Sequence, residues 1–170
     1  MNFAFATHPQ PDFQRSLVRI GIDRPVGQNV GAPPQWAGEP AQLGTVRRVD
    51  FAALAQELAA DPNRILVDAR RVTEWQDGHI KGARHVPLHD LPDNLGQIAA
   101  WSQAAEHAGT DPSIWISCGS GFRATVGASL MARAGIPVVI VDDNFGKAAK
   151  VGLPIVRDDH ALMFGDAYTD

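Results

Sequence analysis

The residues best suited to chemistry lie in the stretch CGSGFR, residues 118–123, which we call the cysteine loop. Cys118 is the only cysteine in the chain, and a cysteine thiolate is a strong nucleophile. Gly119 and Gly121 allow the backbone after it to fold tightly, so that successive N–H groups converge on one point. This pattern predicts an anion-binding turn around a reactive thiol.

The segments that flank the cysteine loop add to this chemistry. An apolar strand is predicted before it, at 113–117, and a helix after it, at 122–135. The helix N-terminus contributes roughly half a positive charge, and Arg123 falls in its first turn. A lone cysteine after a buried strand is most often an inert core residue. Only its combination with two glycines and an arginine points to a thiolate nucleophile at Cys118.

Strands and helices alternate along the chain from residue 46 onward. Asp50 is the expected N-cap of the first helix, and Val126 and Leu130 mark the helix after the cysteine loop. The alternation predicts an α/β fold with a central parallel five-stranded sheet and helices on both faces. Ligands bind at the carboxyl ends of such strands, where Cys118 is expected. Strands are predicted at 45–49, 64–70, 83–88, 113–117 and 138–141, and helical segments at 50–60, 72–78, 95–109, 122–135 and 145–152.

Composition narrows the class of protein. A chain of 170 residues that is 45% hydrophobic can build one sizeable core. Its 15 basic and 19 acidic residues give a net charge of −4, with no basic block, so nucleic acid is not the expected partner. One cysteine forms no internal disulfide and suits a reducing compartment. Together with the absence of a signal-peptide pattern or a long apolar run, this predicts a cytoplasmic protein.

The chain divides into three parts by composition. Residues 1–44 form an N-terminal extension that ends in a Pro- and Gly-rich linker. Residues 45–156 carry the regular pattern and form the single predicted domain. Residues 157–170 form an acidic tail to which no function is assigned.

Three separated motifs resemble the rhodanese superfamily. The sequence CGSGFRA at 118–124 is similar to that family's active-site loop, and residues 140–155 are similar to its C-terminal segment. The match as a whole covers about residues 46–156 and implies a single rhodanese-like domain. The upstream stretch 67–88 carries further family positions, namely Asp68, Arg70, Glu74, Gly78, His79, Ile80, Gly82, Ala83 and Pro87.

The resemblance implies a sulfurtransferase that works through a cysteine persulfide. Cys118 would take the outer sulfur of thiosulfate or of a low-molecular-weight thiol persulfide and pass it to a thiol or to cyanide. No cofactor and no metal are implied, and none of the six histidines has the spacing of a ligand set. The backbone N–H groups that would stabilise the persulfide belong to the substrate-binding residues Gly119, Ser120, Gly121, Phe122 and Arg123.

Four upstream residues are expected to support the site rather than to do chemistry. By the same resemblance, Arg70 and Glu74 form an acid–base pair that clamps the turn after the second strand. His79 would form a hydrogen bond within its own turn, and Asp68 is a satisfied structural residue.

Two other functions were weighed against sulfur transfer. Phosphatase and arsenate-reductase loops resemble C-x5-R, whereas Cys118 and Arg123 are separated by four residues, which makes a tighter ring suited to a single sulfur atom. The second alternative is a non-catalytic rhodanese-like binding module, or a sulfur carrier that partners a metallo-hydrolase. Such modules commonly lack the cysteine that this chain keeps.

The sequence after the last predicted strand departs from the family. Where members carry a Gly-Gly pair and then a Trp, this chain has Asp143 and Asn144 and then Ala148. If the turn lies near the pocket rim, Asp142 and Asp143 would repel doubly charged thiosulfate. We therefore expect a preference for a thiol persulfide, and a gain in thiosulfate activity when Asp143 and Asn144 are replaced by Gly.

The N-terminal extension carries a second, shorter resemblance. Residues 16–27 are similar to the stretch before the rhodanese domain in bacterial fusions with a metallo-β-lactamase-like persulfide dioxygenase. The metal-binding HxHxDH motif of the dioxygenase is absent from this sequence. The resemblance implies either a detached version of that rhodanese module or a protein that acts beside a separate persulfide dioxygenase-like metallo-hydrolase in sulfide metabolism.

Overall fold

A computed structural model describes residues 3–6, 27–30, 35 and 44–157. The chain splits into two compact units, residues 1–45 and 46–170. In the first unit, strands β1 (Phe3–Ala6) and β2 (Gly27–Val30) pair in parallel. Most of the predicted N-terminal extension, and the tail beyond Arg157, lie outside the described residues.

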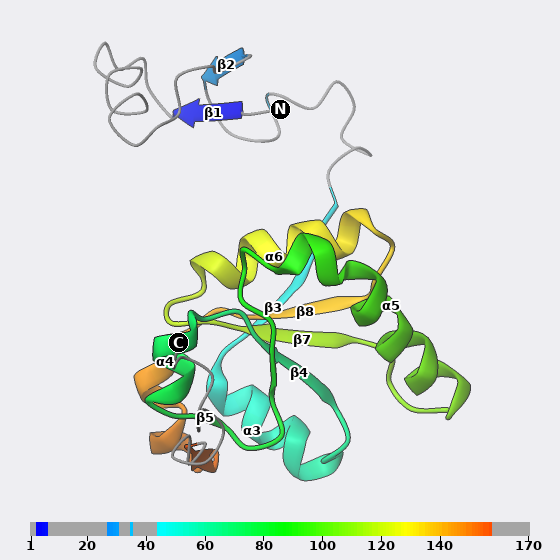
Figure 1. The fold of residues 1–170 in the computed structure, drawn as a ribbon, viewed down its shortest axis with the longest axis vertical. Coiled ribbons are helices and arrows are strands. Elements are labelled where there is room, and N and C mark those ends of the chain that lie inside the picture. Colours follow the sequence, from blue (N-terminus) through cyan, green and yellow to red (C-terminus); the bar gives the residue numbers. More distant parts are fainter. Residues whose placement is uncertain (1–2, 7–26, 31–34, 36–43, 158–170) are drawn as a thin grey trace, which may run out of the picture. The chain divides into compact units, whose positions relative to one another are not determined.

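The second unit is built on a five-stranded sheet, and all strand pairs within this sheet are parallel (Figure 1). This arrangement confirms the predicted α/β fold. The strands β4 (Ile65–Asp68), β7 (Ile114–Ser117) and β8 (Val138–Val141) are nearly continuous runs of apolar side chains, as expected of parallel strands that are covered on both faces. In spatial order the strands are β3 (Arg47–Val49), β8 (Val138–Val141), β7 (Ile114–Ser117), β4 (Ile65–Asp68) and β6 (Arg84–His85).

Helices cover both faces of this sheet (Figure 1). On one face, α5 (Leu91–His107) and α6 (Phe122–Arg133) pack against a cluster that includes Val67, Ile116 and Ile140. On the other face, α3 (Phe51–Ala60) and the 3₁₀ helices η2 (Phe145–Lys147) and η3 (Ala149–Val151) pack against Leu66, Trp115 and Val139. Successive residues of a strand thus enter opposite cores. None of the helices in the described part of the chain is long and apolar enough to span a membrane.

The helix after the cysteine loop does not bury Val126, one of the two apolar residues that mark it in the sequence. Val126 is 37% exposed, and α6 instead turns Ala124, Gly127, Ala128 and Met131 toward the sheet. The physical reason is close approach, because a Cβ at Gly127 would lie 2.6 Å from Cδ1 of Ile116. Small residues on this side let α6 pack closely on β7, which carries the cysteine loop at its end.

Three element boundaries also differ from the sequence prediction. Helix α5 begins at Leu91 rather than at residue 95, because its proline lies in the first turn, where no N–H is needed. The predicted last helix forms the two short 3₁₀ helices instead. Strand β5 (His79–Ile80) pairs antiparallel with β9 (Ile155–Val156), a contact between short segments that periodicity does not reveal.

Strand register brings the functional segments to one edge of the sheet. Asp68 of β4 pairs with Ser117 of β7, and the N–H of Ala69 donates to the carbonyl of Ser117 over 2.9 Å. The carboxyl ends of β4 and β7 are therefore level, and Ala69 lies beside Cys118. Helix α4 (Val72–Gln76), which follows β4, and the cysteine loop, which follows β7, consequently face the same space.

The N-cap of α3 provides a test of the fold. The carboxylate of Asp50 accepts the N–H of Ala53 over 2.8 Å. We expect Asp50→Ala to lower the free energy of unfolding by about 1 kcal/mol, because it removes this cap. The measurement is urea unfolding followed by circular dichroism. The control Gln56→Ala, at an exposed position of the same helix, should change stability by less than about 0.5 kcal/mol. Equal losses in both variants would contradict the capping role.

Candidate functional site

The thiol of Cys118 lies at the N-terminus of α6. Cys118 directly follows β7 and is fully buried, with 0% exposure. Its Sγ accepts the backbone N–H of Ala124, in the first turn of α6, over 3.4 Å. This N–H is one of the donors that a helix leaves without an intrahelical partner. The sulfur thus lies where the positive end of the helix dipole can stabilise an anion.

The two glycines of the cysteine loop are required by its geometry. Gly121 has a φ of +88°, and a Cβ at this position would lie 1.9 Å from Oδ1 of Asp142. A Cβ at Gly119 would lie 2.8 Å from Nη2 of Arg123. A side chain at either place would displace the end of Arg123 or of Asp142, and at Gly121 it would also be strained by the positive φ. The close contacts at Gly119 and Gly121 therefore agree with the predicted tight turn.

An ion pair ties the cysteine loop to α4. Arg123 donates from Nη1 and Nη2 to the two carboxylate oxygens of Glu74, over 2.5 and 2.8 Å. These hydrogen bonds lower the pKa of Glu74 to about 2, so the carboxylate is ionised at any neutral or mildly acidic pH. The hydrogen bonds that Arg123 donates to Glu74 likewise raise the pKa of Arg123, and the nearby Cys118 adds to this effect. Glu74 thus belongs to the site.

The predicted pairing of Arg70 with Glu74 is wrong. Arg70 instead pairs with Asp68, with its Nε and Nη2 lying 2.9 and 2.7 Å from Oδ2, and it also donates to the carbonyl of Gly78 over 2.8 Å. Both charged side chains are buried, and a buried pair of this kind is stable only when its hydrogen bonds are satisfied. Arg70 lies before α4 begins, so the four-residue spacing that joins side chains on a helix does not apply to it.

The Asp68–Arg70 pair supports the cysteine loop through Phe145. The guanidinium carbon of Arg70 lies 3.5 Å from the ring centroid of Phe145, a cation–π contact. The N–H of Phe145 in turn donates to the carbonyl of Gly119 over 3.0 Å. The buried ion pair therefore positions Phe145, whose hydrogen bond holds Gly119 of the cysteine loop.

His79 contributes to the placement of α4. It is buried, and its Nδ1 lies 3.2 Å from the carbonyl oxygen of Trp75. The rings of His79 and Trp75 stack with centroids 3.5 Å apart, and the ring of His85 stacks against the same tryptophan at 4.6 Å. Because Trp75 adjoins Glu74, these contacts fix the helical turn that presents the carboxylate to Arg123.

The acidic turn after β8 does lie against the cysteine loop, but its charges are compensated. Asp142 pairs with Arg48 over 2.8 Å, and Asp143 pairs with Lys147 over 2.7 Å. The hydrogen bond from Lys147 lowers the pKa of Asp143. Neither carboxylate therefore carries an uncompensated charge that would repel an anionic donor. The gain in thiosulfate activity expected on replacing Asp143 no longer follows.

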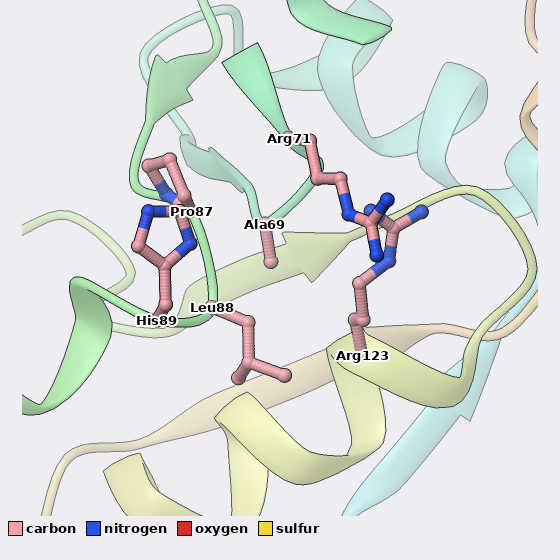
Figure 2. A pocket seen from close by; sticks show the side chains of 6 residues that line it. All are labelled: Ala69, Arg71, Pro87, Leu88, His89 and Arg123. Carbon is pink, nitrogen blue, oxygen red and sulfur yellow. The ribbon is translucent and has the colours of Figure 1, made fainter. Parts of the chain in front are cut away.

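A pocket of about 380 Å³ opens beside the cysteine loop (Figure 2). Arg71 and Arg123 extend toward one end of it, and Pro87 and His89 form the opposite side. Sequence reasoning missed Arg71, Leu88 and His89, because they belong to no spaced motif and are brought here only by the level ends of the strands. The full lining comprises Ala69, Arg71, Pro87, Leu88, His89 and Arg123.

Within residues 44–157, where side chains are described, no group of three or more His, Cys, Asp or Glu residues is placed to hold a metal ion. The titratable side chains at the site are the thiol of Cys118, the Glu74–Arg123 pair, and Arg71 and His89 of the pocket lining.

Similarity to other proteins extends over most of the second unit. The chain is 28% identical over 115 residues to a sulfurtransferase of Allochromatium vinosum, an alignment that spans 67% of this chain and 98% of the relative. It is 25% identical over 96 residues to YrkF of Bacillus subtilis (strain 168), whose name gives it as a candidate sulfur carrier protein. That alignment spans 56% of this chain and only 46% of YrkF.

A solved structure shows the same fold. The rhodanese-like domain protein of Staphylococcus aureus superposes with a TM-score of 0.53 at 22% identity, over 65% of this chain and 99% of that protein. A family model of the rhodanese-like domain matches residues 51–147, which is more than half of the chain and includes the cysteine loop. The chain therefore belongs to the rhodanese-like domain family.

Proposed function

We propose that this protein is a sulfurtransferase that carries sulfane sulfur as a persulfide on Cys118. The observation that carries the proposal is the position of Sγ, which accepts the N–H of Ala124 at the start of α6 beside the Glu74–Arg123 pair. Hydrogen-bond donors and a fixed cation stabilise a sulfur anion at this point. Family membership and the sulfurtransferase of A. vinosum support the same reaction class.

The reaction divides into two sulfur transfers. In the first, the thiolate of Cys118 attacks the outer sulfur of the donor, a new S–S bond forms, and the old S–S bond breaks. Sulfite leaves from thiosulfate, or a thiolate leaves from a thiol persulfide, taking the electron pair of the broken bond. In the second, a thiolate or cyanide attacks the terminal sulfur of Cys118-S-S⁻ and releases the Cys118 thiolate.

The cysteine loop would bind the transferred sulfur through its backbone. The N–H groups of residues 119–123 follow Sγ in a tight turn, and in this proposal they donate to the terminal sulfur atom as the N–H of Ala124 donates to Sγ. Phe122 is 75% exposed and Ser120 is also exposed, so both lie on the solvent side of the loop. Because Cys118 itself is buried, transfer requires a displacement of the loop or of Arg123 that opens Sγ.

The burial of Cys118 also favours a second candidate function. A thiol with 0% exposure is what a non-catalytic rhodanese-like module would show, with the cysteine serving as a core residue. The similarity to YrkF extends this alternative to a sulfur carrier that works with a partner enzyme. A metallo-hydrolase of the persulfide dioxygenase type remains our proposed partner, and a cytoplasmic location remains a prediction.

The persulfide itself decides between these functions. We expect brief exposure of the purified protein to thiosulfate or to a thiol persulfide to add one sulfur, about 32 Da, because the thiolate forms a covalent adduct. Intact mass spectrometry measures the gain, which cyanide or excess thiol should discharge. The Cys118→Ser variant should gain nothing. A folded wild-type protein that gains no sulfur from any donor would show that the non-catalytic reading is correct.

The geometry of Gly121 gives a second test with a matched control. Gly121→Ala places a methyl group 1.9 Å from Oδ1 of Asp142, besides the strain of a positive φ. Gly135, at the end of α6, has a similar φ of +77° but nothing within 4 Å of its Cβ position. We expect Gly121→Ala to slow persulfide formation by about tenfold or more, whereas Gly135→Ala costs only about 1–2 kcal/mol of stability.

Rates of persulfide formation should be measured by mass spectrometry at a temperature where both glycine variants are folded. Equal rates in the two variants would show that the shape of the cysteine loop does not control the reaction.

A further inference from the structure

We propose that Arg71 recognises a carboxylate of the sulfur donor, and that the donor is the persulfide of a small carboxylate-bearing thiol bound in the pocket beside the cysteine loop. This inference rests on the proposed sulfurtransferase function and names its substrate class. It follows from the charges, the walls and the size of the pocket shown in Figure 2.

The two arginines of the pocket differ in their availability. Arg123 has both terminal nitrogens bonded to Glu74, so its charge is compensated before any ligand arrives. Arg71 is exposed, and within the described part of the chain its guanidinium forms no ion pair. Figure 2 shows the two guanidinium groups at the same end of the pocket. Arg71 therefore supplies the uncompensated positive charge, and a guanidinium binds a carboxylate through two parallel hydrogen bonds.

The remaining walls favour a ligand with carbon atoms. Ala69 and Leu88 lie between the arginine end and the side formed by Pro87 and His89. Ala69 is beside Cys118, because Asp68 and Ser117 are paired in register. A donor that rests on Ala69 and Leu88 thus brings its sulfur toward the thiol while its carboxylate reaches Arg71.

The size of the pocket agrees with this donor class. A volume of about 380 Å³ lies within the range of sites for small organic ligands and exceeds what thiosulfate would fill. Thiosulfate also offers no apolar group to the walls of Ala69, Pro87 and Leu88. In the transfer itself, the outer sulfur of the persulfide bonds to Sγ of Cys118, and the carboxylate-bearing thiolate leaves with the electron pair of the broken S–S bond.

Two donors that differ in charge test the role of Arg71. Glutathione persulfide carries carboxylates, whereas 2-hydroxyethyl persulfide has none. We expect Arg71→Gln to raise KM for glutathione persulfide about tenfold while kcat changes little, because a bidentate charged contact is lost on binding. With 2-hydroxyethyl persulfide neither constant should change. Arg71→Lys keeps the positive charge but lacks the planar guanidinium that forms two parallel hydrogen bonds. Its KM for glutathione persulfide should fall between those of wild type and Arg71→Gln.

The control variant is Arg133→Gln, which removes an exposed arginine from the last turn of α6, away from the lining of the pocket. It should leave both donors unaffected. Equal effects of Arg71→Gln on both donors, or no effect on either, would overturn the proposal.

A binding measurement separates this proposal from the proposed function. Reduced glutathione, the product thiol, is titrated calorimetrically into the Cys118→Ser protein, which cannot turn over. Arg71→Gln in that background should weaken binding about tenfold. Unchanged binding overturns the role of Arg71 even if Cys118 carries sulfur. Binding that depends on Arg71, in a protein whose Cys118 accepts no sulfur, would instead mark a carboxylate-thiol site and overturn the donor role.

Discussion

The ion pair between Glu74 and Arg123 is the interaction on which the arrangement of the site depends. It joins the turn after β4 to the first turn of α6 and crosses directly over the cysteine loop. Gly119 must lack a side chain because Nη2 of Arg123 occupies the space where a Cβ would lie. The same pair neutralises one of the two arginines in the neighbouring pocket and so leaves Arg71 as the cation that an anionic ligand meets.

Buried polar side chains on both sides of this pair help to position it. The Asp68–Arg70 pair fixes the chain before α4 and braces Phe145, which bonds to Gly119. Stacking of His79 and His85 on Trp75 fixes α4 itself. The acidic side chains beside the loop, Asp142 and Asp143, are paired with Arg48 and Lys147, so the helix N-terminus can stabilise a sulfur anion without opposition from a free carboxylate. The family positions Asp68, Arg70 and His79 thus take no chemical part in sulfur transfer and instead position the loop that carries Cys118.

The sequence was sufficient for the features that depend on local pattern. Apolar runs and glycine exits predicted the five strands, Asp50 predicted the first helix cap, and the cysteine loop fell at a strand end as expected. The partner of Arg70 was not predictable from spacing, because Arg70 lies before α4 begins and its partner Asp68 is only two residues away. The buried side of α6 did not follow from Val126 and Leu130, because close packing on β7 selected small residues instead. Arg71 lies at the pocket only because β4 and β7 are paired in register, and no sequence motif encodes this register.

The most direct test of this account is a double-mutant cycle on the Glu74–Arg123 pair. The rate at which Cys118 gains sulfur from a thiol persulfide is measured for wild type, Glu74→Gln, Arg123→Gln and the double variant. If the two side chains act as one unit, each single variant loses about tenfold and the double variant loses far less than the roughly 100-fold product. Losses that multiply would show that the residues act independently, and they would contradict the claim that this ion pair organises the site.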